Sequence, residues 1–349
     1  MKLEVDRFDK KKKSDKELVL KTEKNKSRFF QNKTLIYIIG SIVVAVLAIT
    51  SYVSFLSAPV SEKSEDYVYF EVKKGESKRQ IARALSEKHL IRSSNAFFLS
   101  TYFSGKDLLA GYYKLASSMS TNQIISKIQS GDVDAFTLTI PEGYRVLQIA
   151  KKLEEVGKID PNKFLESAGG TEGTLFPDTY MVPYGMEEAK IVKMFKDNYE
   201  QKTSKYRVVN DQLILASIVE REAKKDDERA KIAAVYKNRA DKNMLLQADP
   251  TVRYGLDSQT YLKNKSLNFE FWSPLTRADI NALNSSFNTY KQKGYPPAPI
   301  CNPGIKSIEA ALSPENNFDY LFFFHDKNGT IHFSKTYEEH LKGIQEFGV

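Results

Sequence analysis

The sequence predicts an α+β protein that has an N-terminal transmembrane helix followed by two mixed α+β domains. Residues 35–58 are uncharged and rich in Ile, Val, Leu and Ala, and they exceed the ~20 residues that a helix needs to cross a bilayer. After them, short segments rich in β-formers alternate with stretches of helical periodicity. We therefore divide the chain into a basic tail (1–33), a transmembrane helix (34–58), a linker (59–66), a small module (67–133) and a large domain (134–349).

The net charge of +8 is concentrated at the N-terminus. Residues 1–33 hold 12 Lys and Arg against 6 Asp and Glu, which leaves 40 of 52 basic and 38 of 44 acidic groups for the rest of the chain, a net of +2. A surface that follows nucleic-acid phosphates needs a larger basic excess. DNA binding is therefore a weak alternative, and no nucleic-acid partner is expected.

The charges around the apolar segment predict its orientation. Basic residues dominate upstream of it, while acidic residues outnumber the single lysine downstream at 62–66. The positive-inside rule then places residues 1–33 in the cytoplasm and the chain after about residue 59 outside the membrane. A cleaved signal peptide is disfavoured, because its apolar region is shorter and its basic region is not this long.

Cysteine and histidine spacing predicts neither a disulfide nor a metal site. Cys301 is the chain's one cysteine, and the four histidines have no Cys or Glu partners at metal-ligand spacing. We expect no cofactor and no metal, and we interpret Cys301 as a packed side chain.

The small module is predicted to run strand, helix, helix, strand. The strands are expected at 67–72 and 111–115, the helices at about 81–88 and 95–103, and a further helix at 121–129 is closed by Gly131. With the V-x-x-G-x-S phrase at Val72–Ser77, this order resembles a LysM-like module. The alternative is a small packing module without affinity for sugars.

The large domain is predicted to begin with a strand and a turn at 136–144. Helices are expected at 146–156, 161–166, 187–202, 211–224 and 227–241. The glycine-rich and aromatic segment 169–180 is predicted to be a loop that packs against a cleft or lines it.

Glu222 is the candidate catalytic residue. In the helix 211–224, the residues Leu215, Ile218 and Val219 form one apolar stripe at about 100° per residue, and Glu222 falls inside it, while Glu220 projects to the other side. A carboxyl group among apolar side chains keeps its proton more readily, as a general acid near neutral pH requires. The alternative is a carboxylate paired near a helix end with Arg221, Lys225 or Arg239.

Three later segments favour a cleft for sugars. The segments 246–255, 285–290 and 294–304 are dense in Asn, Gln, Tyr and Pro, and the first is predicted to be a loop that carries hydrogen-bonding side chains. Each alone is more typical of a structural turn. Together with a desolvated glutamate, they indicate a groove of the glycosidase type.

At these residues the chain resembles the endolytic murein transglycosylase family, also called YceG-like or MltG proteins. The matching phrases occur in order over about residues 67–345: EGTLFPDTY (172–180), ASIVERE (216–222), Asn238-Arg239, LQADPTVRYG (246–255), FNTY (287–290), Pro296-Pro297, Asn302-Pro303-Gly304, His332-Phe333-Ser334 and His340. Ala223, Ser285-Ser286-Phe287 and Ala298 depart from the usual pattern.

The resemblance implies a membrane-anchored enzyme with a lysozyme-like catalytic domain. Its substrate would be the glycan strands of peptidoglycan, its catalytic glutamate would be Glu222, and its partners would be cell-wall synthesis or division proteins. The substrate-binding candidates are Gln247, Asp249, Asn288, Tyr290 and Glu220. The product would carry a 1,6-anhydro end, because the MurNAc 6-hydroxyl closes on C1 and no second carboxylate has to hold a water. The rivals are a muramidase that uses water and a non-catalytic peptidoglycan-binding scaffold.

Overall fold

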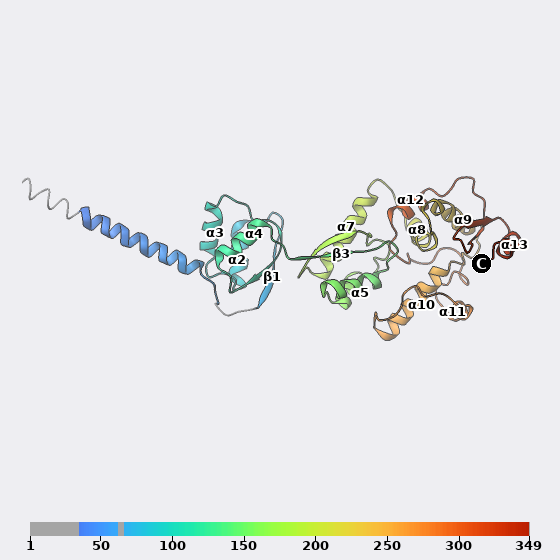
Figure 1. The fold of residues 1–349 in the computed structure, drawn as a ribbon, viewed down its shortest axis with the longest axis horizontal. Helices are drawn as coiled ribbons and strands as arrows, with labels where there is room; N and C mark the ends of the chain where they lie inside the picture. Colours follow the sequence, from blue (N-terminus) through green and yellow to red (C-terminus); the bar gives the residue numbers. More distant parts are fainter. Residues whose placement is uncertain (1–34, 62–65, 349) are drawn as a thin grey trace, which may run out of the picture. The chain divides into compact units, whose positions relative to one another are not determined.

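The computed structural model describes residues 35–61 and 66–348. The chain forms two compact units, Met1–Val133 and Asp134–Val349, each a mixture of helices and short antiparallel strand pairs (Figure 1). The protein is therefore of mixed α+β class. The predicted basic tail and residues 62–65 of the predicted linker lie outside the described residues.

The apolar segment forms one continuous helix, Leu35–Ser57. Its 23 residues have a mean hydropathy of 2.3. At 1.5 Å per residue the helix is about 35 Å long, against ~30 Å for a hydrocarbon core. The hydroxyls of Ser41 and Thr50 donate to the carbonyls of Ile38 and Leu47, so these two polar groups are satisfied within the helix. The helix is thus long and apolar enough to cross a membrane.

The rest of the first unit is built on one antiparallel strand pair. Strand β1 (Tyr67–Val72) pairs with β2 (Gly111–Ala116), and helices α2 (Lys78–Glu87) and α3 (Ser94–Phe103) lie between them in sequence, with α4 (Thr121–Ser130) after them. Each predicted element is confirmed to within three residues. The core is apolar and fully enclosed, and its largest members are Phe70, Ile81, Leu85, Phe97, Tyr113, Leu115, Ile124 and Ile128.

Local sequence explains where the helices of this unit begin and end. The hydroxyls of Ser77 and Ser120 each accept a hydrogen bond from the backbone N–H three residues on. The side chains of Gln80 and Gln123 in turn accept one from the backbone N–H of the serine, which makes a capping box at each helix start. Gly131 adopts φ 68° after α4, a conformation that glycine reaches without strain.

The second unit begins with another antiparallel pair, β3 (Ala135–Thr139) with β4 (Thr179–Pro183). Three helices surround it: α5 (Val146–Gly157), α6 (Pro161–Ser167) and α7 (Glu188–Thr203). Their common core is aliphatic and aromatic and contains Phe136, Leu138, Ile149, Leu153, Phe164, Val182 and Phe195.

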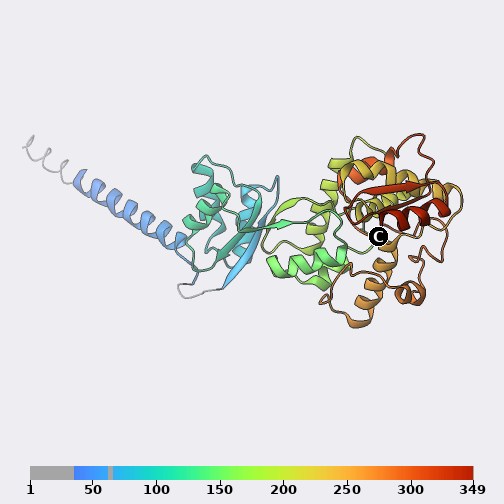
Figure 2. The same ribbon diagram turned by 45° about the vertical axis from the view of Figure 1, so that its right-hand side comes forward.

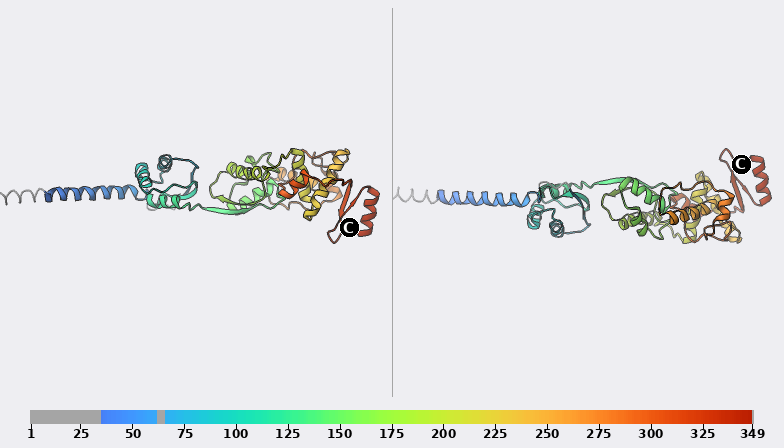
Figure 3. Two further views of the ribbon diagram at one scale, coloured as in Figure 1. Left: turned by 90° about the horizontal axis from the view of Figure 1, so that it is seen from above. Right: turned by 90° about the horizontal axis from the view of Figure 1, so that it is seen from below.

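A second core in the same unit holds the helices that carry the candidate site. Helix α8 (Asn210–Glu222) packs against α9 (Arg229–Asp241) and α12 (Ile305–Leu312), as Figure 2 shows at the upper right. Helices α10 (Asp249–Asn264) and α11 (Arg277–Ala282) follow α9 in sequence. The hairpin β5 (Phe322–His325) and β6 (Ile331–Ser334) is covered by α13 (Tyr337–Phe347), which is clear in both views of Figure 3.

Two predicted loops differ from the structure. The predicted loop at 246–255 becomes helix from Asp249 on, because Pro250 stands in the first turn, where its missing N–H costs nothing. The predicted loop 169–180 ends two residues early, because Thr179 and Tyr180 pair with Thr139 and Leu138 in the β3–β4 ladder. In addition, the helix predicted from 227 opens with a short 3₁₀ turn, Asp226–Glu228.

Candidate active site

Glu222 is the last residue of α8 and follows a completely buried stretch of that helix. Residues Leu213–Val219 are all buried, so α8 is enclosed on every side there and the expected single stripe is broader than predicted. Even Ser217 is fully enclosed, and its hydroxyl donates to the Ile214 carbonyl at 2.7 Å and accepts from the Ile300 N–H at 3.0 Å. The partly exposed Glu222 side chain therefore emerges where this core meets the surface.

The surroundings of Glu222 favour its protonated form. Burial raises the pKa of the Glu222 carboxyl from 4.5 to about 7, and the nearby Asp249 carboxylate also raises it. A hydrogen bond from Tyr236 and the cations of Arg239 and Arg221 act in the opposite direction, lowering the pKa. Glu222 also stands at the C-terminus of α8, a helix end where negative charge is disfavoured.

Helix α9 supplies the direct partner of Glu222. The hydroxyl of Tyr236 donates a 2.8 Å hydrogen bond to Oε1 of Glu222, and the Tyr236 side chain is only 2% exposed. One turn later, the buried Arg239 donates from Nε to the Leu321 carbonyl and from Nη1 to the Leu246 carbonyl, both at 2.6 Å. These bonds fix a positive charge next to the Glu222–Tyr236 pair.

Asp249 and Tyr290 form a second pair that acts electrostatically on Glu222. The Tyr290 hydroxyl donates a 2.6 Å hydrogen bond to Oδ1 of Asp249, which is exposed at the start of α10. Burial raises the pKa of Tyr290, and the carboxylates of Asp249 and Glu222 raise it further. Asp249 also raises the pKa of Glu222, so the three groups share one electrostatic environment.

Backbone contacts hold these two segments together. Gln247 donates its N–H to the Thr289 carbonyl at 3.1 Å, and Ala248 donates its N–H to the Thr289 hydroxyl at 3.0 Å. Gln247 has φ 50° and an exposed side chain. The predicted residues Gln247, Asp249 and Tyr290 are therefore gathered by one pair of adjacent segments beside Glu222.

Asn288, the fourth residue predicted to bind substrate, makes its hydrogen bonds inside the protein. Its side chain is fully buried, its Nδ2 donates to the carbonyls of Ile280 (2.8 Å) and Leu283 (2.9 Å), and its Oδ1 accepts from the Tyr290 N–H at 3.1 Å. All of these contacts lie within the protein. Asn288 therefore holds the loop that carries Tyr290.

Glu220 is likewise engaged inside the protein. Its side chain is 6% exposed and forms a 3.2 Å ion pair with Arg229, while its Oε2 accepts from the Gly304 N–H at 2.9 Å. Desolvated charges need such partners. The Glu220 carboxylate thus joins α8 to α9 and to the start of α12.

This arrangement would allow a single residue, Glu222, to act as both general acid and general base. A carboxyl with a pKa of about 7 is present in both protonation states near neutral pH, so Glu222 can both give and take a proton. Among the described residues, no group of three or more His, Cys, Asp or Glu side chains is placed to hold a metal ion. Cys301 is fully buried.

The model of the YceG-like family matches residues 70–346 of this chain. The chain belongs to the YceG-like family. The match covers the module at 67–133 almost completely as well as the domain that carries Glu222.

Relatives of this YceG-like chain cover most of its length. The endolytic murein transglycosylase of Bacillus subtilis is 31% identical over 336 residues, which span 85% of this chain and 89% of that protein. The endolytic murein transglycosylase of Streptococcus pneumoniae is 27% identical over 337 residues, 82% of this chain but only 60% of the longer relative. A crystal structure of a putative YceG-like protein from Listeria monocytogenes is 33% identical, with a TM-score of 0.53, over 80% of this chain and 99% of that one.

Tyr236, the residue in direct contact with Glu222, is not among the site residues predicted from the sequence. A signal was present, since Tyr236 lies three residues before Arg239 in the matching phrase Asn238-Arg239, on the same face of one helix. A tyrosine among the buried Ile232, Ala233 and Val235 also needs a partner for its hydroxyl.

Glu172 is a second acid with a raised pKa in this YceG-like chain, and it is not among the site residues predicted from the sequence. Burial raises its pKa to about 7, and the Arg145 cation opposes the shift. Its Oε1 accepts from the Val146 N–H at 3.0 Å and from Asn302 Nδ2 at 3.3 Å, and its Oε2 accepts from the Tyr254 hydroxyl at 3.2 Å. Glu172 thus ties three distant segments together beside a cavity of about 620 Å³.

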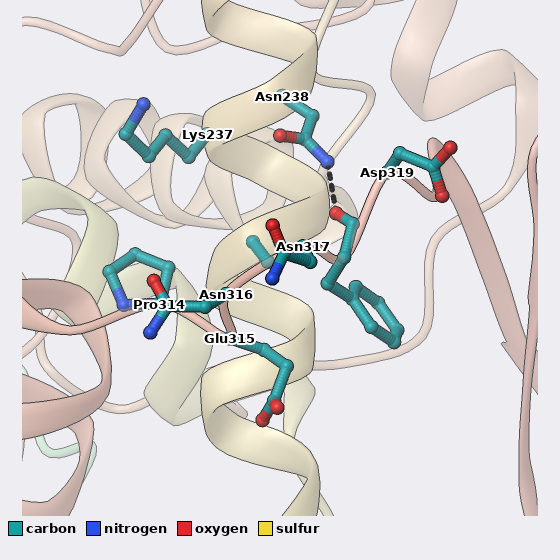
Figure 4. Close-up of a pocket in the computed structure, with 9 residues that line it drawn as sticks. Lys237, Asn238, Pro314, Glu315, Asn316, Asn317 and Asp319 are labelled. Carbon is teal, nitrogen blue, oxygen red and sulfur yellow. Dashed lines mark hydrogen bonds between the residues drawn. The ribbon is translucent and has the colours of Figure 1, made fainter.

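A further cavity, of about 550 Å³, lies on another face of α9. Figure 4 shows Asn238 directed from α9 toward the segment 314–319, and its Nδ2 donates to the Phe318 carbonyl at 2.7 Å. Asn238 is two residues from Tyr236, about 200° around the helix, so this cavity does not open onto the Glu222 carboxyl. Asn238 therefore holds the 314–320 segment in place.

Proposed function

We propose that this YceG-like chain is an endolytic murein transglycosylase that cleaves the MurNAc–GlcNAc β-1,4 bond within peptidoglycan glycan strands and leaves 1,6-anhydro-MurNAc ends. The observation that carries the proposal is the Glu222 carboxyl, with a pKa of about 7 and a fixed hydrogen-bond partner at the edge of a buried helix. The relatives named endolytic murein transglycosylase support the same substrate class.

Glu222 acts first as an acid and then as a base. Its proton passes to the glycosidic oxygen while the bond from that oxygen to C1 breaks. The resulting carboxylate removes the proton of the MurNAc 6-hydroxyl, and the freed oxygen bonds to C1. No water is consumed, and Glu222 ends in its starting protonation state.

The residues around Glu222 orient its carboxyl, stabilise the charge on the sugar and position the glycan strand. Tyr236 occupies Oε1, which leaves Oε2 for proton transfer. The Asp249 carboxylate stabilises the positive charge that develops on the sugar ring, and Tyr290 fixes the direction of that carboxylate. Gln247, exposed beside Asp249, orients the strand.

The apolar helix Leu35–Ser57 anchors the enzyme as a single pass, with residues 1–33 in the cytoplasm and the chain after about residue 59 outside the membrane. The first unit is LysM-like in its order β1, α2, α3, β2, and the second carries a lysozyme-like catalytic domain. An anchored enzyme acts on strands close to the membrane, so it terminates or trims nascent strands beside cell-wall synthesis and division proteins.

Product analysis tests the proposal. Purified glycan strands are digested with the full chain or with the Glu222→Gln variant, and the products are resolved by mass spectrometry. The wild type should release muropeptides that are lighter by one water than hydrolysed ones, and the variant should release none. Hydrated ends would indicate a muramidase, and binding without any product from the wild type would indicate a scaffold.

A further inference from the structure

Helix α3 carries an exposed apolar stripe. Leu99, Tyr102 and Phe103 are 51%, 65% and 80% exposed. They stand three and four residues apart, so they share one face of the helix. Phe97 and Thr101, on the other face, are fully buried in the core of the first unit. The stripe therefore takes no part in the hydrophobic core of this unit.

Basic side chains border this stripe. The Arg79 guanidinium lies 4.8 Å from the ring centre of Phe98, and Arg83 stands one turn further along the same face of α2. Lys106 follows the end of α3, where Lys78 Nζ donates to the carbonyls of Thr101 (2.9 Å) and Lys106 (2.8 Å). Arg79, Arg83 and Lys106 are all exposed. The cations of α2 and Lys106 thus give the uncharged α3 the combination of apolar and basic side chains that favours binding at a membrane interface.

The charge of the chain after the apolar helix is concentrated in the same unit. Residues 67–133 hold 10 basic and 5 acidic side chains, a net of +5, whereas residues 134–349 hold 29 basic and 30 acidic ones, a net of −1. The part of the chain nearest the proposed anchor is thus the part that a negatively charged surface attracts.

A direct contact places the start of α3 at the end of the apolar helix. Arg92 Nε donates to the Pro59 carbonyl at 2.8 Å, and its guanidinium lies 4.8 Å from the ring centre of Phe55, two residues before the apolar helix ends at Ser57. Arg92 immediately precedes Ser93, the N-cap of α3. Helix α3 is about 15 Å long, so its exposed stripe lies within roughly that distance of Ser93, its N-cap.

We propose that α3 docks flat on the anionic lipid surface of the bilayer that holds the apolar helix, with Leu99, Tyr102 and Phe103 inserted among the headgroups. This inference rests on the proposed anchor. Arg92 holds one end of α3 at the anchor, the stripe holds the other end, and Arg79, Arg83 and Lys106 face the lipid phosphates. The contact fixes the module at residues 67–133 against the membrane.

Depth-dependent quenching tests the docking. The full chain with Phe103→Cys carries a fluorescent label, since Cys301 is fully buried and does not react. It is reconstituted into phosphatidylglycerol–phosphatidylcholine vesicles that contain nitroxide lipids. The label should be quenched strongly, and more by a nitroxide near the headgroup than by one near the chain end, because interfacial helices insert only ~5–10 Å. The same label at Ser126→Cys, exposed on α4, should be quenched several-fold less.

Two charge variants test the role of the cations. Arg79→Glu with Arg83→Glu should abolish the quenching at position 103. Lys163→Glu with Lys196→Glu, which makes the same change of charge in the second unit, should leave it intact. Equal quenching at 103 and 126, no quenching at 103, or quenching that survives the Arg79 and Arg83 changes would overturn the proposal.

The outcomes separate this inference from the proposed function. Failure of the anchor would appear as a chain that does not float with the vesicles, whereas failure of the docking alone would leave a floating chain with an unquenched label. Glycan cleavage is measured independently of both. If soluble glycan strands instead change the fluorescence of the label at 103 in the absence of lipid, the stripe is a sugar-binding surface and the membrane docking is wrong.

Discussion

The Tyr236 hydroxyl donates to Oε1 of Glu222 across a separation of 14 residues, and this contact joins the end of α8 to the middle of α9. It lowers the pKa of a carboxyl that burial alone would raise further. The acidity of Glu222 is therefore a balance between desolvation and a small number of named neighbours, and each neighbour can be changed separately.

Tyr236→Phe should raise the pKa of Glu222, because it removes a hydrogen bond that stabilises the carboxylate. If the reaction begins with protonated Glu222, the loss of activity at high pH should move upward. A hydrogen bond to a charged group contributes about 1.5–3 kcal/mol, so its loss as the charge develops should slow the reaction roughly 10- to 100-fold. The pH profile of glycan cleavage measures both effects, and an unchanged profile would contradict this role for Tyr236.

Asp249→Asn should shift the same profile in the opposite direction. The Asp249 carboxylate raises the pKa of Glu222, so a neutral amide in its place lowers that pKa and moves the loss of activity to lower pH. The asparagine Oδ1 can still accept from Tyr290, which makes the change conservative. The paired pH profiles of Tyr236→Phe and Asp249→Asn provide the check, because shifts of the same sign would reject the electrostatic assignment.

Glu172→Gln should weaken the dependence of stability on pH. A carboxyl whose pKa is raised from 4.5 to about 7 in the folded state contributes stability that is complete below pH 4.5 and is lost as the pH rises through about 7. The shift of 2.5 units corresponds to roughly 3 kcal/mol. Denaturant unfolding at pH 5 and pH 8 measures the difference, which should shrink in the variant. Glu338→Gln, at an exposed position, is the matched control.

Arg145→Met should destabilise the second unit strongly. Arg145 and Asp257 are 1% and 4% exposed and 3.2 Å apart, so the change leaves a buried carboxylate without its main partner. Breaking such a pair costs about 3–5 kcal/mol, and the lower end is expected here because Arg253 remains 3.7 Å from Asp257. Lys193→Met, which breaks the exposed Lys193–Asp197 pair, should leave the free energy of unfolding almost unchanged, because solvent screens such a pair. Equal losses in chemical denaturation would contradict the assignment.

Local sequence predicted most elements of the fold well. The capping serines Ser77 and Ser120 and the helix-ending Gly131 act within one turn, so they could be interpreted without any tertiary contact. The predictions were wrong where two local sequence features favoured different structures. At 246–255 the polar composition suggested a loop, although Pro250 suits the first turn of the helix that α10 forms.

In the candidate site, too, local sequence predicted some features and could not predict others. The helical period alone placed Glu222 at the end of a buried stretch, and the uncharged apolar composition alone indicated where the apolar helix lies. The partners of Glu222 could not be found like this. Asn288 and Glu220 looked like ligand-binding residues in sequence, but their contacts with Ile280, Leu283, Arg229 and Gly304 occupy them inside the protein.

By itself, the sequence determined the apolar helix, the distribution of charge, the positions of most helices and strands, and the choice of Glu222 over Glu220. These features depend on composition and on the short-range geometry of a helix. Only the tertiary structure decided that Tyr236 holds Glu222, that Tyr290 holds Asp249, and that Glu172 is a second buried acid. Each of these relationships joins segments far apart in the chain, and long-range packing, which no local period encodes, brings them together.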